Sequence, residues 1–237
     1  KVLDAEEVLI IEKNLNKMSA FPKTVRMFLV TVTVLPQKEG IDLPRFIQKL
    51  TNLLADYSTA TRVVYKFKVS GESRILSVIH VSNIIGFERT IGGLCRLGAV
   101  EVDCQPVVSY ENFARSIKVA EHLTKVNSGG LAKEGLYWLE FDIEYIGKTT
   151  DELIAVWRKE AEAVLTARLK EGTSIELYKS VAQRKVHVFI NAADPEQVDL
   201  LSLQLPLMQE NGSNVQLKCK ALQYLEDYTA RITSESV

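Results

Sequence analysis

The chain has 237 residues, 46% of them hydrophobic, and its 29 basic and 30 acidic residues give a net charge of −1. This balance lacks the positive excess with which proteins attract nucleic acids or acidic lipids, so we expect neither partner. The apolar runs are about ten residues or fewer, the length of strands, so we expect no membrane-spanning segment. Three cysteines without metal-type spacing favour reduced thiols, no metal site and a cytoplasmic location.

The first 25 residues form an extension ahead of the first regular pattern. Asp4 and Glu7 have the spacing of a capping box, which marks a helix start. The apolar residues that follow at helical spacing are Val8, Ile11, Leu15 and Met18. We therefore predict a docked N-terminal helix over residues 1–18.

Residues 26–110 contain a strand, helix, strand, strand, helix, strand pattern. Its first strand, Met27–Val34, alternates β-branched residues, and Pro44 marks the first turn of the helix that follows. Ser70–Ser73 is a hairpin signal, and glycines interrupt the second helix. Residues 111–134 are expected to form a helical linker that ends near Gly129 and Gly130.

The same order of patterns returns in residues 135–224, followed by a helical tail over residues 225–237. Trp138–Tyr145 corresponds to the first strand, and Val215–Leu222 corresponds to Val100–Val107. Thr149 and Glu152 form a second capping box before a long helix. A repeated βαββαβ order predicts an α+β fold of two ferredoxin-like units. Each unit has an uncovered sheet face, so we expect the two sheets to pack together as an intramolecular dimeric α+β barrel.

Several short motifs resemble the muconolactone isomerase family of dimeric α+β barrels. The first strand and its closing Leu-Pro are similar to the family's opening strand. The second repeat adds three matches, at Leu169–Thr173, at Val188-Phe189 before Asp194-Pro195, and at Leu203–Leu207. The resemblance implies a small-molecule ligand, assembly into oligomers, and proton transfer within an unsaturated lactone without cofactor or metal.

The polar residues on the strands of the second repeat form the candidate site. By period-two alternation, Glu140 and Asp142 share one face of a strand, and Glu176 and Tyr178 share one face of the next. We predict these four as catalytic residues of a cofactor-free isomerase, in a pocket between the repeats, because crowded carboxylates can act as acid or base. The alternatives are a non-catalytic small-molecule binding protein and a protein-interaction module on the same scaffold.

Other reactive residue types favour structural interpretations. His80 and His187 lie on third strands but do not align under the repeat, which argues against a duplicated catalytic histidine. Trp138 and Trp157 are expected to serve packing.

Overall fold

A computed structural model describes residues 26–36, 40, 42–55, 60–125 and 129–234. The predicted N-terminal helix lies outside these described residues. The strands are β1 (Arg26–Val34), β2 (Thr61–Val69), β3 (Arg74–Val81), β4 (Val100–Ser109), β5 (Leu136–Ile143), β6 (Ile175–Ser180), β7 (Lys185–Asn191) and β8 (Val215–Tyr224). The helices are α2 (Leu43–Leu53), α3 (Ile84–Arg96), α4 (Tyr110–Ser116), α5 (Glu121–Thr124), α6 (Thr150–Glu171), α7 (Pro195–Gln204), α8 (Pro206–Asn211), the 3₁₀ turn η1 (Gly212–Asn214) and α9 (Leu225–Ser234).

The eight strands form one closed antiparallel barrel in the order β1-β3-β2-β8-β5-β7-β6-β4. The mixed α+β fold predicted from the repeat is confirmed at this level. Two seams join the halves of the barrel, β2 with β8 around Lys68 and β4 with β6 around Val108. Each seam pairs three residues of either strand, Phe67–Val69 with Leu222–Tyr224 and Val107–Ser109 with Tyr178–Ser180.

Hydrophobic residues from every strand meet in the interior of the barrel, which we call the lumen. The lumen cluster has at least one member on each strand: Leu29, Phe67, Val69, Leu76, Val78, Val107, Leu136, Trp138, Tyr178, Phe189 and Leu222. Successive strand residues point to opposite faces, so alternate positions fill the lumen while the others contact the helices outside. The barrel is therefore a packed core for most of its length.

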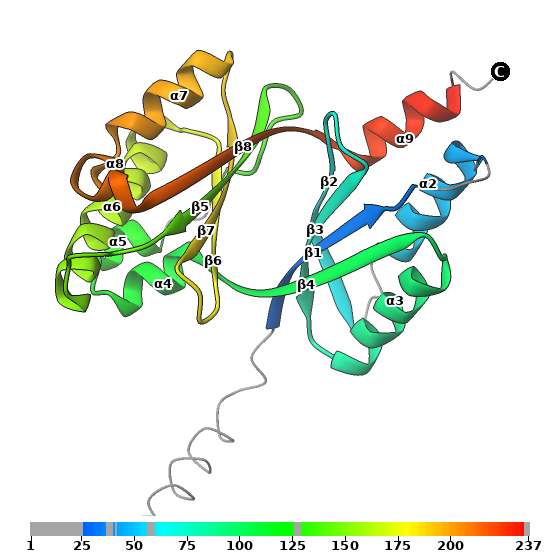
Figure 1. Cartoon of the computed structure of the whole chain (residues 1–237), viewed down its shortest axis with the longest axis horizontal. Helices are drawn as coiled ribbons and strands as arrows, with labels where there is room; N and C mark the ends of the chain where they lie inside the picture. The colour runs from blue at the N-terminus through cyan, green and yellow to red at the C-terminus, as the bar shows by residue number, and fades with distance from the viewer. Residues whose placement is uncertain (1–25, 37–39, 41, 56–59, 126–128, 235–237) are drawn as a thin grey trace, which may run out of the picture.

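The helices lie outside the barrel in two groups, one on each side (Figure 1). The capping box of Thr149 and Glu152 starts α6, and Gly172 in the left-handed conformation ends it, as the sequence predicts. The glycines of α3 do not interrupt that helix, contrary to expectation. Gly86 and Gly93 instead allow close packing, because an added Cβ would lie 2.2 Å from Ala60 Cβ and 2.7 Å from Leu53 Cδ2.

The two halves exchange helices. The strand β4 belongs to the first half, but α4 and α5 that follow it pack into the core of the second half through Tyr110, Ala114 and Leu123. In the same way, β8 crosses back and delivers α9 to the first half, where Leu225 joins that core (Figure 1). The segments expected to be a linker and a tail therefore complete the core of the opposite half.

Within the described residues, none of the helices combines the length and the hydropathy that a membrane crossing requires.

Candidate functional site

The four residues predicted as catalytic lie on two strands that are not neighbours. Glu140 and Asp142 are on β5, Glu176 and Tyr178 are on β6, and β7 runs between them. The register places Glu140 opposite His187 and His187 opposite Tyr178, so these three form one row across the strands. Tyr178 belongs to the lumen cluster, so the row faces the lumen.

Glu140 lies in a polar bay of about 270 Å³ at one end of the lumen. The bay is lined by Leu29, Thr31, Thr33, Arg74, Glu101, Asp103, Gln105, Trp138, Glu140, Lys185 and His187. Lys185 Nζ is 3.4 Å from Glu140 Oε1 and 3.3 Å from Asp142 Oδ1. Lys185 thus bridges both predicted carboxylates of β5, and Lys218 Nζ lies 3.9 Å from Glu140 Oε1 as well.

At the inner end of this bay, His187 lies between a serine and a carboxylate, as the histidine of a hydrolytic triad does, but without the hydrogen bonds of a triad. Its Nε2 is 3.1 Å from Ser180 Oγ, and its Nδ1 is 3.7 Å from Glu140 Oε2. However, Trp138 Nε1–H donates to Nδ1 at 3.4 Å, so the proton of the neutral ring is on Nε2 and points at Ser180. This tautomer does not accept the serine proton. Burial also lowers the pKa of His187 to about 4, so His187 is a neutral, hydrogen-bonded residue of the core.

Glu176 and Tyr178 have structural partners away from this bay. Tyr65 on β2 donates its hydroxyl to Glu176 Oε1 at 2.8 Å, which links the first half to the second. Tyr178 is 4% exposed and packs edge to face against Phe189, and its pKa is raised mainly by burial. Of the four predicted residues, only Glu140 lines the bay, so the expected pocket containing all four is not formed. Their catalytic role stays a prediction.

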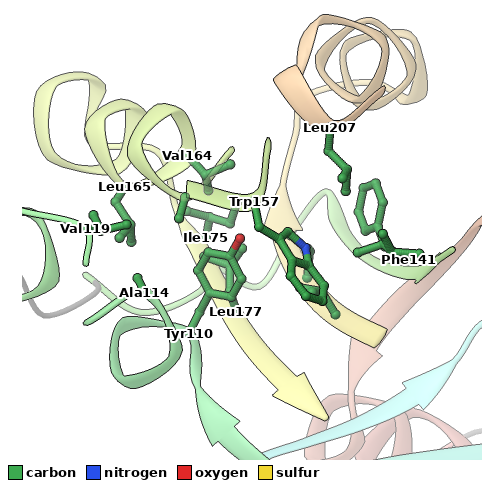
Figure 2. Close-up of a cluster of buried hydrophobic side chains, with 14 of the residues drawn as sticks. Tyr110, Ala114, Val119, Phe141, Trp157, Val164, Leu165, Ile175, Leu177 and Leu207 are labelled. Atoms are coloured by element: carbon green, nitrogen blue, oxygen red, sulfur yellow. The ribbon is translucent and has the colours of Figure 1, made fainter. Parts of the chain in front are cut away.

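A second cavity, of about 290 Å³, lies outside the barrel, between the sheet of the second half and the helices α6, α7 and α8. We call it the outer cavity. Its sheet side consists of Leu139, Phe141, Ile175, Leu177, Val186, Val188 and Ile190. Figure 2 shows the same region, with Trp157 and Tyr110 beside one another between α6 and the sheet. The walls are mostly aliphatic and aromatic, which is typical of a site for an apolar ligand.

Glu160 is the charged residue among those that line the outer cavity. It is 6% exposed, and its Oε2 accepts a hydrogen bond from the Leu207 backbone N–H at 2.9 Å. None of the described lysines, arginines or histidines forms an ion pair with it. Burial therefore raises the pKa of Glu160 from 4.5 to about 7, against the opposing effect of the Leu207 hydrogen bond.

Two more polar groups belong to the outer cavity. The Trp157 Nε1–H is buried and has no hydrogen-bond partner among the described residues. Tyr110 is 2% exposed, and its pKa is raised by burial and further by Glu160. Figure 2 shows the Trp157 nitrogen on the side of the ring turned toward Leu207 and Phe141, and the Tyr110 hydroxyl turned toward Ile175. An unpaired buried donor is costly, so Trp157 marks a place where a partner is missing.

The sequence contains one signal for this cavity, in the pattern of α6. Trp157, Ala161 and Val164 form the apolar stripe of α6, and Glu160 lies on that stripe, three residues after Trp157. Burial of a carboxylate on the inward face of an amphipathic helix is costly, so such a residue indicates either a charged or hydrogen-bonding partner or a functional site. The contribution of Tyr110 could not be expected, because it depends on the exchange of α4 between the halves.

Comparisons with known proteins place the fold. No protein-family model matches the sequence, and no curated protein matches it. Among solved structures, a chlorite dismutase variant from Candidatus Nitrospira defluvii in complex with cyanide is similar, with a TM-score of 0.57 and 14% identity over 92% of this chain and 98% of that one. The chlorite dismutase from the same organism in complex with imidazole has a TM-score of 0.57 and 12% identity over the same shares of the two chains.

These neighbours are chlorite dismutases and not muconolactone isomerases, and at 12–14% identity they show what fold this chain shares. The family resemblance inferred from the sequence is wrong, and so is the cofactor-free isomerase function that it implied. The misleading motifs have a structural cause. Asp194-Pro195 is the capped start of α7, and Leu205-Pro206 is the break before α8, so both are helix-boundary signals.

Cyanide and imidazole are ligands of transition-metal ions, so we asked whether the outer cavity could hold a haem group. The side chains that commonly hold haem iron are His, Cys, Met and Tyr. Of these types, the lining of the outer cavity contains Tyr110 alone, and α6 contains none. Iron binding requires a tyrosinate, but the pKa of Tyr110 is raised. The residues of this cavity do not fit haem. The described residues also contain no cluster of three or more His, Cys, Asp or Glu that could hold a metal ion.

Proposed function

We propose that this chain binds a small, mostly apolar organic molecule in the outer cavity of its second half. The observation that carries the proposal is the cavity of about 290 Å³ with a buried, unpaired Trp157 donor in its wall. An apolar cavity of about 150 Å³ binds benzene. The outer cavity has about twice that volume, which suits a molecule with two fused rings.

The apolar lining supplies the affinity in this proposal. Burial of apolar surface contributes roughly 25 cal/mol for each Å² removed from water. The few polar groups would orient the ligand, which is the usual division of roles in small-molecule sites. Because no metal or haem ligand set lines the cavity, the proposal includes no redox step.

The first test is a titration of the protein with naphthalene, with binding measured by fluorescence. Mass spectrometry of the natively purified protein then shows whether a ligand is retained. We expect saturable binding with one site per chain. Ala163 lines the cavity, so Ala163→Leu should fill part of it and weaken binding at least tenfold. Ala155→Leu, on the exposed side of the same helix, is the matched control and should leave binding unchanged. Equal binding by both variants would place the ligand elsewhere.

Three finer expectations belong with this proposal. The strand orders β4-β1-β3-β2 and β8-β5-β7-β6 support two ferredoxin-like units within the barrel. A cytoplasmic location is supported by the free state of Cys95, Cys104 and Cys219. Assembly of several copies stays a prediction, which light scattering coupled to size exclusion would test.

A further inference from the structure

The outer cavity has a polar corner formed by Trp157, Glu160 and Tyr110. Trp157 Nε1–H can only donate a hydrogen bond, and it has no acceptor among the described residues. The Tyr110 hydroxyl lies in the same cavity and is turned toward Ile175, so Trp157 is the member of this corner that presents an unpaired buried donor. A ligand that satisfies this corner must bring an acceptor oxygen or nitrogen.

The charge of Glu160 favours an uncharged acceptor over a carboxylate. Above pH 7, where Glu160 is ionised, a carboxylate ligand would bring a second negative charge next to it, in a region where burial strengthens repulsion. Lys179 is a cation beside this corner, and its Nζ lies 5.4 Å from the Trp157 ring centroid. Lys179 is already engaged, because its Nζ donates to the Ser180 carbonyl at 2.8 Å and to the Gln183 carbonyl. These two carbonyls hold the Lys179 ammonium, and no cation of the described residues forms an ion pair with Glu160 in the corner.

We propose that the ligand of the outer cavity is an uncharged two-ring carbonyl compound, whose carbonyl oxygen accepts a hydrogen bond from Trp157 Nε1–H. This inference depends on the proposed function, because it names the chemical class bound at the same site. The rings occupy the aliphatic part of the cavity between α6 and the sheet. Glu160 excludes carboxylates of the same shape. A ketone thus removes the unpaired donor that the ligand-free protein carries.

The test uses three probes of the same shape: 2-acetylnaphthalene, 2-ethylnaphthalene and 2-naphthoate. We expect the ketone to bind about fivefold more tightly than the hydrocarbon, because a net hydrogen bond contributes about 1 kcal/mol. We expect 2-naphthoate at pH 8 to bind at least tenfold more weakly than the ketone. Glu160→Gln should reduce that discrimination against 2-naphthoate.

The wild-type protein provides an internal control, because its two tryptophans differ in their partners. In a ¹⁵N–¹H spectrum, the ketone should shift the indole N–H signal of Trp157. The indole N–H of Trp138 already donates to His187 and should not move. Trp157→Phe assigns the two signals, and it should also lower ketone affinity to that of the hydrocarbon.

The outcomes separate this inference from the proposed function. If none of the three probes binds, the proposed function fails. The ligand class is wrong if the ketone binds no more tightly than 2-ethylnaphthalene, or if ketone binding does not shift the Trp157 signal. Binding of 2-ethylnaphthalene would still support the proposed cavity. Tighter binding of 2-naphthoate than of the ketone would also overturn the class.

Discussion

Two buried titratable residues, Glu160 and His187, have neutral forms that the fold favours, and they make opposite contributions to the pH dependence of stability. Burial raises the pKa of Glu160 to about 7 and lowers the pKa of His187 to about 4. The folded state therefore binds more protons at Glu160, and fewer at His187, than the unfolded state does. Between pH 4.5 and 6.5 the two contributions oppose each other, so single variants are needed to measure either.

Glu160→Gln should stabilise the protein above pH 7 and have little effect below pH 4.5. The stability that protonated Glu160 contributes is fully present below its unfolded pKa and is lost as pH rises through about 7. A shift from 4.5 to about 7 corresponds to about 3 kcal/mol, which is the upper bound of the expected gain at pH 8. Urea unfolding at pH 4.5 and pH 8 measures it. Glu162→Gln, two residues along the same helix, is the control, and an equal gain there would refute burial as the cause.

The wild-type protein should lose stability as the pH falls from 6.5 to 4, and His187→Gln should remove that loss. Because the folded pKa is depressed, the unfolded chain takes up a proton below pH 6.5 that the folded chain takes up only near pH 4. The wild type should therefore lose up to about 3 kcal/mol from this group between pH 6.5 and pH 4. Thermal unfolding across that range should give a shallower slope for the variant. His122→Gln, at an exposed position of α5, should retain the wild-type slope.

At the scale of elements, α3 shows how two glycines in one helix can have different roles. A Cβ on Gly86 would lie 2.2 Å from Ala60 Cβ, whereas one on Gly92 would meet only the Arg96 guanidinium at 3.6 Å. We expect Gly86→Ala to destabilise the protein by about 1–3 kcal/mol through overpacking. Gly92→Ala should stabilise it by about 0.5–1 kcal/mol, because alanine loses less backbone freedom in a helix. Chemical unfolding of both variants tests the pair, and a gain in both would contradict the close approach of α3.

The elements that the sequence predicts well depend on local signals. The alternation in Met27–Val34 predicts β1, and Thr149 with Glu152 predicts the start of α6. The features that sequence reasoning misses depend on contacts far apart in the chain. The β2–β8 seam pairs Phe67 with Tyr224, and no local pattern near either residue specifies it. The surroundings of the candidate residues are missed for the same reason, because Tyr65 from the other half donates a hydrogen bond to Glu176, and the outer cavity requires Tyr110 from α4.

At the scale of the whole molecule, similarity to chlorite dismutases extends over 92% of the chain, but the cavity residues do not provide a haem ligand. We therefore expect that incubation with haemin produces no stable complex with an axially ligated iron spectrum. The measurement is the absorption spectrum after gel filtration. A retained, sharp haem band that Tyr110→Phe abolishes would show that the cavity does hold haem. The same band in that variant would point to non-specific adsorption.

The first half should not fold alone. A fragment ending at residue 128 would expose the lumen face of its sheet, including Leu29, Phe67 and Leu76, and would lack α9. So large an apolar surface is not tolerated by a monomer, so we expect aggregation. Sedimentation of the expressed fragment measures this. A monomeric fragment that unfolds cooperatively would contradict the interdependence of the halves.

Because each half contributes helices to the core of the other, these contacts matter more for holding the halves together than the peptide that connects them. Residues 1–127 carry α4 and α5, which the second half lacks, and residues 128–237 carry α9, which the first half lacks. Two strand seams and the Tyr65–Glu176 hydrogen bond hold the pieces together without the connecting peptide. The chain should thus behave as a heterodimer that happens to be synthesised as one polypeptide. If the two fragments are co-expressed, we expect them to copurify as a 1:1 complex.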